Sequence, residues 1–133
     1  MSRENVEIVR RGYEAFARGG VDFELLDPEI EWHGPPEFSE LAGPYHGHDG
    51  VRRYMEALNE VFEDYRMVPE DFIDAGPDQV LVFSREGGSG KGSGAAVQTH
   101  PTGHLWTLRD GKAVHMRSYW ERAEALEAVG LRE

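Results

Sequence analysis

Hydrophobic residues in the first half of the chain recur mostly at helical spacing. The first set predicts an amphipathic helix that ends at Gly19-Gly20, with apolar positions three or four residues apart: Val6, Val9, Tyr13 and Phe16. A short helix is expected over 22–26 and a longer one over 49–62, whose apolar face comprises Val51, Tyr54, Met55, Leu58, Val61 and Phe62. Between these helices, residues 29–33 alternate and predict a strand with Ile30 and Trp32 on one face.

The second half changes to the patterns of strands. Residues 65–75 are expected to be extended, with Pro69 indicating a bulge or an edge position, and residues 79–85 form a near-continuous apolar run. The glycine-rich stretch 87–94 joins two strands and does not lead into a helix, which favours a flexible hairpin over a phosphate-binding loop. The strand that follows is expected to be interrupted at 100–103.

A long hairpin is predicted over 103–120, because Asp110-Gly111 separates two alternating segments. One face of the first arm carries His104, Trp106 and Leu108, and one face of the second carries Val114, Met116, Ser118 and Trp120. A strand face with one imidazole between indole and aliphatic groups is typical of an apolar cavity that binds small molecules.

The other face of the second arm carries His115, Arg117 and Tyr119. The ring-bearing side chains of His115 and Tyr119 on an outward face predict contact with a second copy of the chain, so we expect a homodimer. A short final helix is expected over 122–129, ending at Gly130.

The order of these elements is helix, helix, strand, helix and then four strands. This order predicts an α+β fold in which helices wrap a strongly curved, mostly antiparallel sheet and enclose an apolar interior, as in a cone. No repeat or linker divides the chain, so we expect one domain spanning 1–133.

Composition limits the classes of partner and the location that we expect for the protein. A net charge of −11 over 133 residues argues against nucleic acid, which needs a basic footprint. No run of about 18 apolar residues exists, so we expect no membrane span. The chain has no cysteine and no apolar signal core at its start, which favours a cytoplasmic location.

Four segments of the chain are similar to SnoaL-like proteins, in the superfamily that includes nuclear transport factor 2 and ketosteroid isomerase: Leu25–Pro35, Gly47–Arg53, Leu105–Lys112 and Arg122–Leu131. The resemblance covers almost the whole chain and implies the same cone-shaped fold. It does not specify a reaction, because members range from isomerases, cyclases and epoxide hydrolases to proteins with no known reaction.

The resemblance to ketosteroid isomerase also implies roles for particular residues. Tyr13 matches the tyrosine of the isomerase oxyanion hole, and His104 takes the position of its carboxylic acid. The resemblance and the strand faces together imply a cavity wall made of Trp32, Tyr54, Trp106, Met116 and Trp120. The catalytic aspartate of the isomerase is replaced by Gly34, which argues against steroid-type isomerisation.

Tyr13 and His104 could both donate hydrogen bonds to one ligand oxygen, and His104 could also accept a proton. The alternative is that both are ordinary core residues with protein partners. We expect no metal and no cofactor. His46 and His48 have only Asp49 as a nearby third ligand, and Asp49 is also a good N-cap for the following helix. His100 and His104 would lie about 13 Å apart along a regular strand, unless Pro101 folded them closer. His33 and His115 are expected to face outward.

Two functions remain open on this basis. One is an enzyme, such as an isomerase, cyclase or hydrolase, that uses Tyr13 and His104 in acid–base chemistry on an apolar polyketide-, terpenoid- or steroid-like substrate. The other is a non-catalytic ligand-binding or dimeric interaction module that uses the same cavity. Both take a small hydrophobic organic molecule as the partner.

Overall fold

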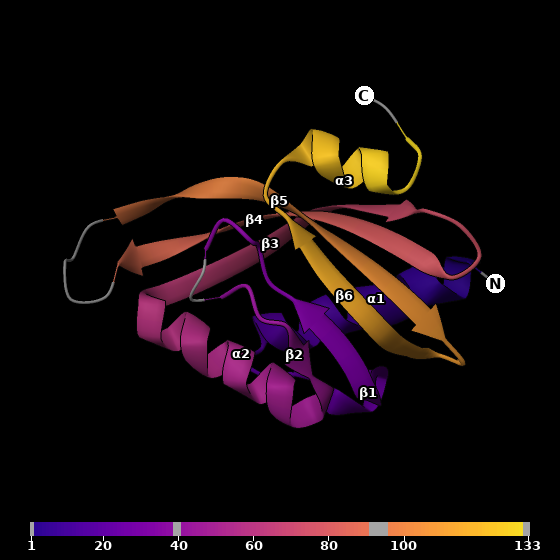
Figure 1. Ribbon diagram of the computed structural model, residues 1–133, viewed down its shortest axis with the longest axis horizontal. Helices are drawn as coiled ribbons and strands as arrows, with labels where there is room; N and C mark the ends of the chain where they lie inside the picture. The colour runs from indigo at the N-terminus through magenta and orange to yellow at the C-terminus, as the bar shows by residue number, and fades with distance from the viewer. Residues whose placement is uncertain (1, 39–40, 91–95, 132–133) are drawn as a thin grey trace.

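The computed structural model describes residues 2–38, 41–90 and 96–131. In these segments one sheet is combined with three α-helices and one short 3₁₀ turn (Figure 1). The elements follow one another along the chain as α1 Ser2–Ala17, η1 Phe23–Leu25, β1 Leu26–His33, β2 Tyr45–His46, α2 Gly47–Val61, β3 Phe62–Asp74, β4 Gln79–Gly90, β5 Ala96–Arg109, β6 Lys112–Tyr119 and α3 Arg122–Ala128.

The sheet has six strands in the described residues, in the order β2-β1-β6-β5-β4-β3. All neighbouring pairs are antiparallel except β1 and β6, which run parallel. The sheet is curved and does not close on itself (Figure 1). The expected α+β class with a curved, mostly antiparallel sheet is therefore confirmed.

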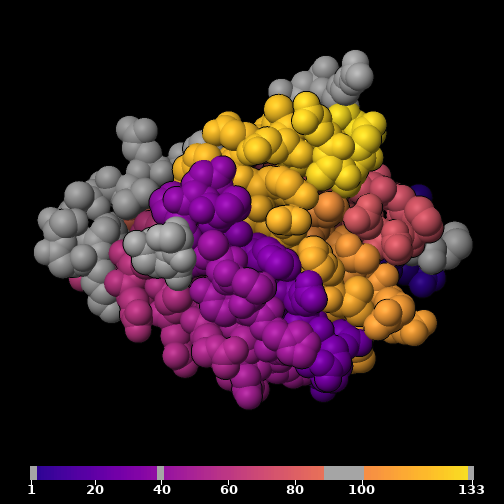
Figure 2. Space-filling model, in the orientation of Figure 1, coloured from indigo at the N-terminus to yellow at the C-terminus, as the bar shows by residue number. Residues whose placement is uncertain are grey.

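The helices cover both faces of the sheet. On the concave face α1 packs through Val9 and Tyr13 against β4 and β5, and α2 packs through Val51, Tyr54 and Leu58 against β1 and β6. The short α3 covers the convex face, where Ala125 and Leu126 contact β4 and β5 through Leu81, Phe83 and Leu105. Figure 2 shows atoms of β1 directly beside those of β6, although the two strands lie far apart in the sequence.

The hairpin that joins β5 and β6 turns at the expected residues. Asp110 and Gly111 both have positive φ, 54° and 80°, which is the backbone of the two-residue turn that suits twisted antiparallel strands. Pro69 also lies where its pattern indicates, because β3 is an edge strand whose register shifts between Pro69 and Asp71.

The expected interruption at 100–103 is wrong. β5 continues through these residues, with Pro101 opposite Arg85 and Gly103 opposite Phe83 on β4. β6 pairs with β5 only from Gly103 onward, so Pro101 has β4 as its strand neighbour and no partner on β6. The N–H that proline lacks is therefore not needed for a bond to a second strand. Of the expected glycine-rich hairpin, β4 occupies the residues up to Gly90, while 91–95 lie outside the described residues.

A register shift between Thr107 and Leu108 of β5 changes which residues of β6 face the interior. Beyond it Ala113, rather than Val114, lies in the same buried cluster as Met116. Tyr119, expected on an outward face, packs against the α3 cluster on the convex side.

The short helix expected over 22–26 is reduced to η1, capped by the Asp22 carboxylate, and β1 begins already at Leu26. None of the helices in the described segments is long and apolar enough to cross a membrane.

Candidate functional site

A cavity of about 80 Å³ lies between α1, α2 and the concave face of the sheet. Its wall is mostly apolar and includes three of the four methionines, Met55, Met67 and Met116. Because one buried water needs only about 10–15 Å³ on such a scale, the cavity has room for several waters or a small organic group. Methionine side chains rotate and adapt easily, so this wall can adjust to a ligand.

Six of the seven residues predicted for the site line this cavity: Tyr13, Trp32, Tyr54, His104, Trp106 and Met116. The seventh, Trp120, lies elsewhere. Its ring packs edge-on against Phe38 with centroids 4.9 Å apart, and it lines a second cavity of about 40 Å³. Trp120 is therefore not among the residues that line the main cavity, although the second cavity shares Tyr54 and Glu86 with it.

A continuous chain of hydrogen bonds crosses the wall of the main cavity. The Trp106 Nε1–H donates to the Tyr13 hydroxyl oxygen at 3.0 Å. That hydroxyl lies 2.6 Å from His104 Nδ1, and His104 Nε2 lies 3.1 Å from Glu86 Oε1. The Tyr65 hydroxyl donates to the same Glu86 oxygen at 2.6 Å. Tyr13 and His104 were expected to donate together to one ligand oxygen, but in the structure they bind each other.

One arrangement of protons satisfies every link of this hydrogen-bond chain. An indole N–H can only donate, so the Tyr13 oxygen accepts from Trp106. In the tautomer of His104 with its proton on Nε2, the ring donates to the Glu86 carboxylate and its Nδ1 accepts the Tyr13 proton. Each link has one donor and one acceptor, and the chain ends on a negative charge.

Glu86 is a buried carboxylate, with 14% of its side chain exposed. Burial alone raises its pKa, but His104 and the hydrogen bonds from His104, Tyr65 and Thr102 outweigh burial, so the pKa of Glu86 lies below its ordinary value of 4.5. The group is therefore ionised at neutral pH and can stabilise positive charge on the imidazole.

The pKa of Tyr13 shifts in the opposite direction to that of Glu86. Burial raises the pKa of this phenol well above its ordinary value, and the hydrogen bond from Trp106 offsets only part of that effect. Tyr13 therefore keeps its proton at neutral pH. It can still pass a proton along, because its oxygen can accept one proton while its own moves to His104.

The indole of Trp32 supplies an unused donor. Within the described residues, its buried Nε1 has no hydrogen-bond partner. The Tyr54 hydroxyl interacts with this N–H, but not at hydrogen-bonding geometry. A buried donor without a partner costs about 1–3 kcal/mol, which an oxygen atom of a ligand would recover.

Glu86 was missed by the sequence reading. It pairs with His100 across the strands, whereas His104 pairs with Val82, and four residues span about 13 Å along a flat strand. Inward curvature and two long side chains close that gap. The period-2 pattern offered a hint, since Val80, Val82, Ser84 and Glu86 share one face and a carboxylate at the end of an apolar face needs a partner.

Of the histidine pairs considered for a metal, the structure describes the side chains of His46 and His48, which bind different groups. His46 forms an ion pair with Glu29 at 3.1 Å, whereas His48 Nε2 lies 2.9 Å from the Leu26 carbonyl oxygen. The side chain of His100 lies outside the described residues.

A family model described as a SnoaL-like domain matches residues 9–116 of the chain. The chain belongs to the SnoaL-like family. Its fold is also similar to an NTF2-like protein of unknown function from Burkholderia pseudomallei, which is 27% identical with a TM-score of 0.78 and coverage of 96% of this chain and 98% of that one. This places the family in the wider group of NTF2-like proteins, as the resemblance indicated.

Two further solved structures are similar to the chain. TerC, co-crystallised with polyporic acid, is 28% identical with a TM-score of 0.74, and the match covers 95% of this chain and 98% of TerC. A putative SnoaL-like polyketide cyclase from Jannaschia sp. shares the fold at 23% identity, with a TM-score of 0.72 and coverage of 98% and 94%. No curated protein matches the chain.

Gly34, which the resemblance matches to the isomerase aspartate, has no room for a side chain. The residue is buried, and a Cβ atom added there would lie 1.9 Å from the backbone oxygen of Leu41. The Gly34 N–H also donates to the Ala42 carbonyl at 3.0 Å, which holds the loop against this position. No side chain fits at the position that matches the isomerase aspartate, so acid–base chemistry would depend on other groups.

Proposed function

We propose that this SnoaL-like protein catalyses proton transfer on a small, mainly apolar organic substrate that carries an oxygen atom. The hydrogen-bond chain from Tyr13 through His104 to Glu86 in the wall of an apolar cavity is the observation that supports this function. It joins a phenol, an imidazole and a carboxylate, which is the arrangement used to move and stabilise protons in acid–base catalysis.

The proton path uses the tautomer of His104 that carries its proton on Nε2. The Tyr13 oxygen accepts a proton from the substrate while the Tyr13 proton moves to His104 Nδ1. The imidazolium that results keeps its Nε2–H on Glu86, whose negative charge stabilises it. Reversal returns a proton to a different atom of the substrate, which is an isomerisation. The Trp32 N–H would bind the substrate oxygen, where negative charge develops.

The size of the cavity constrains the substrate. A cavity of about 80 Å³ is smaller than the roughly 150 Å³ cavity that takes up benzene in another protein. A polycyclic substrate would place only its reacting end beside Tyr13 unless the methionines moved. The co-crystallisation of TerC with polyporic acid and the shared fold of a putative polyketide cyclase favour a small organic ligand here too.

A non-catalytic binding module is the second candidate, and one observation favours it. Tyr13 and His104 satisfy each other, so the unpartnered Trp32 N–H is a donor that remains for a ligand. The same cavity would then hold a ligand without reaction.

Proton exchange into cyclopentanone separates the two candidates, because this probe combines an apolar ring with one carbonyl oxygen. We expect the wild-type protein to accelerate deuterium incorporation beside the carbonyl in D₂O, followed by proton NMR. Quenching of tryptophan fluorescence by the ketone without accelerated exchange would support the binding module instead. The absence of both quenching and exchange would contradict both candidates.

We also propose a cytoplasmic homodimer. The convex side of β6 supports the assembly, because Arg117 is exposed and His115 is partly exposed there. Tyr119 does not contribute to this surface, since it packs against the cluster beneath α3. The surface is therefore narrower than the sequence indicated.

A further inference from the structure

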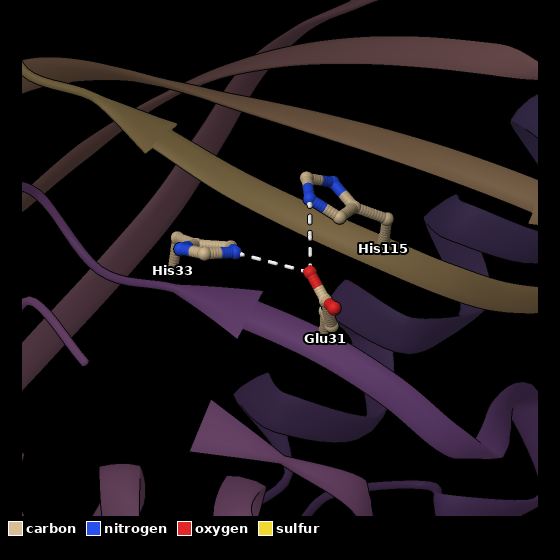
Figure 3. Close-up of side chains that lie close together, drawn as sticks. All are labelled: Glu31, His33 and His115. Atoms are coloured by element: carbon tan, nitrogen blue, oxygen red, sulfur yellow. Dashed lines mark hydrogen bonds and ion pairs between the residues drawn. The ribbon is translucent and has the colours of Figure 1, made fainter. Parts of the chain in front are cut away.

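Three possible metal ligands meet on the convex face of the sheet. Glu31 and His33 extend from β1, and His115 extends from the neighbouring strand β6 (Figure 3). The adjacent residues Trp32 and Met116 point the other way and line the main cavity. The cluster is thus separated from the proposed catalytic chain by the thickness of the sheet.

The strand register explains why these three residues meet. Glu31 is the direct partner of His115 in the parallel β1–β6 pair, and His33 lies two residues further along β1, on the same face. The backbone ladder fixes the relative positions of the three Cα atoms, so the side chains need little ordering to converge.

The spacing of the ligand atoms is close to that of a tetrahedral metal site. His33 Nε2 lies 3.4 Å and His115 Nε2 lies 3.9 Å from Glu31 Oε2, and the ligand atoms of the three residues all lie within 4.8 Å of one another. Zinc bonds of about 2.0–2.1 Å in a tetrahedron place neighbouring ligand atoms about 3.3 Å apart. The ligand atoms would therefore need to approach one another by at most about 1.5 Å, which small side-chain rotations can supply.

We propose that Glu31, His33 and His115 bind one divalent transition-metal ion, with Zn²⁺ as the best-matched ion. Two imidazoles and one carboxylate are a common donor set for Zn²⁺ with three protein ligands. In the single chain the fourth position is open to water, since the side chains of His33 and Glu31 are 25% and 58% exposed. The bound ion would also link β1 to β6.

One further histidine lies beside Glu31 but pairs elsewhere. His46, the partner of Glu31 on β2, is paired instead with Glu29 and is not needed for the site.

Calorimetric titration of the full-length, untagged and metal-free protein with Zn²⁺ tests the site. We expect one Zn²⁺ per chain, with binding weakened about tenfold or more in both His33→Gln and His115→Gln, since even the loss of an outer-sphere partner costs about 10–100-fold. His48→Gln is the matched control, because His48 contacts the Leu26 carbonyl on β1 away from the cluster, and it should bind like wild type.

Replacement of Zn²⁺ by Co²⁺ adds a spectroscopic readout. Intense visible bands typical of four- or five-coordinate Co²⁺ should appear with wild type and His48→Gln and be lost with His33→Gln and His115→Gln. The proposal is overturned if Zn²⁺ shows no saturable binding. It is also overturned if both cluster variants bind as tightly as wild type, or if His48→Gln weakens binding as much as they do.

Discussion

Tyr13→Phe is expected to slow deuterium exchange into cyclopentanone by about 10²–10⁴-fold, the usual contribution of a positioned acid or base. The substitution removes one oxygen atom and leaves the ring that packs edge-on against Phe72 and Trp106. Without that oxygen the substrate has no group to pass its proton to His104 Nδ1. Rates from proton NMR at equal protein concentration give the comparison.

Tyr119→Phe is the matched control, because it removes the same atom from a tyrosine that packs on the convex side of the sheet. Its exchange rate should stay within about twofold of wild type. Circular dichroism would establish that both variants fold. A folded Tyr13→Phe protein with the wild-type rate would contradict the proposed proton path.

Glu86→Ala is expected to lower the free energy of unfolding by about 3 kcal/mol at neutral pH. The change leaves the Nε2 of the buried His104 and the hydroxyl of the partly buried Tyr65 without their acceptor, and a buried donor left unpaired costs about 1–3 kcal/mol. Glu86→Gln keeps an acceptor oxygen and should lose about 1 kcal/mol. Urea unfolding of the three proteins measures the differences, and a Glu86→Ala protein as stable as wild type would contradict the buried network.

The same comparison has a defined pH dependence. Because the folded protein holds the pKa of Glu86 below 4.5, the unfolded chain binds more protons at this residue in the window beneath that value. The stability that the carboxylate contributes is thus fully present above pH 4.5 and is lost as the pH falls through the folded pKa. The advantage of wild type over Glu86→Gln should shrink in that direction.

Local pattern predicted most of the fold. The helix spacing around Val9 and Tyr13 and the Asp110-Gly111 turn each depend on a few neighbouring residues, so they could be read directly. Pro101 was read as an interruption, because its effect depends on whether a second strand lies beside it. A one-residue register shift exchanged Ala113 for Val114, and such shifts depend on pairing between strands rather than on either strand alone.

The candidate site was predicted in part for the same reason. Tyr13 and His104 could be placed by their match to a known family, and the structure brings them within hydrogen-bonding distance. Glu86 joins them only because the sheet curves, and curvature has no simple pattern in sequence. The meeting of His33 with His115 likewise depends on the parallel pairing of two strands about eighty residues apart, which local periodicity does not reveal.

The positions of the protons on His104 test the central claim most directly, because the proposed path requires Tyr13 to donate to this ring. Nitrogen NMR of labelled wild-type protein at neutral pH, assigned with His104→Gln, reports them. The proposed hydrogen-bond chain predicts a slowly exchanging proton on His104 Nε2, bonded to Glu86, and an unprotonated Nδ1 that accepts from Tyr13. A proton on Nδ1 alone, or a ring that exchanges freely with solvent, would contradict it.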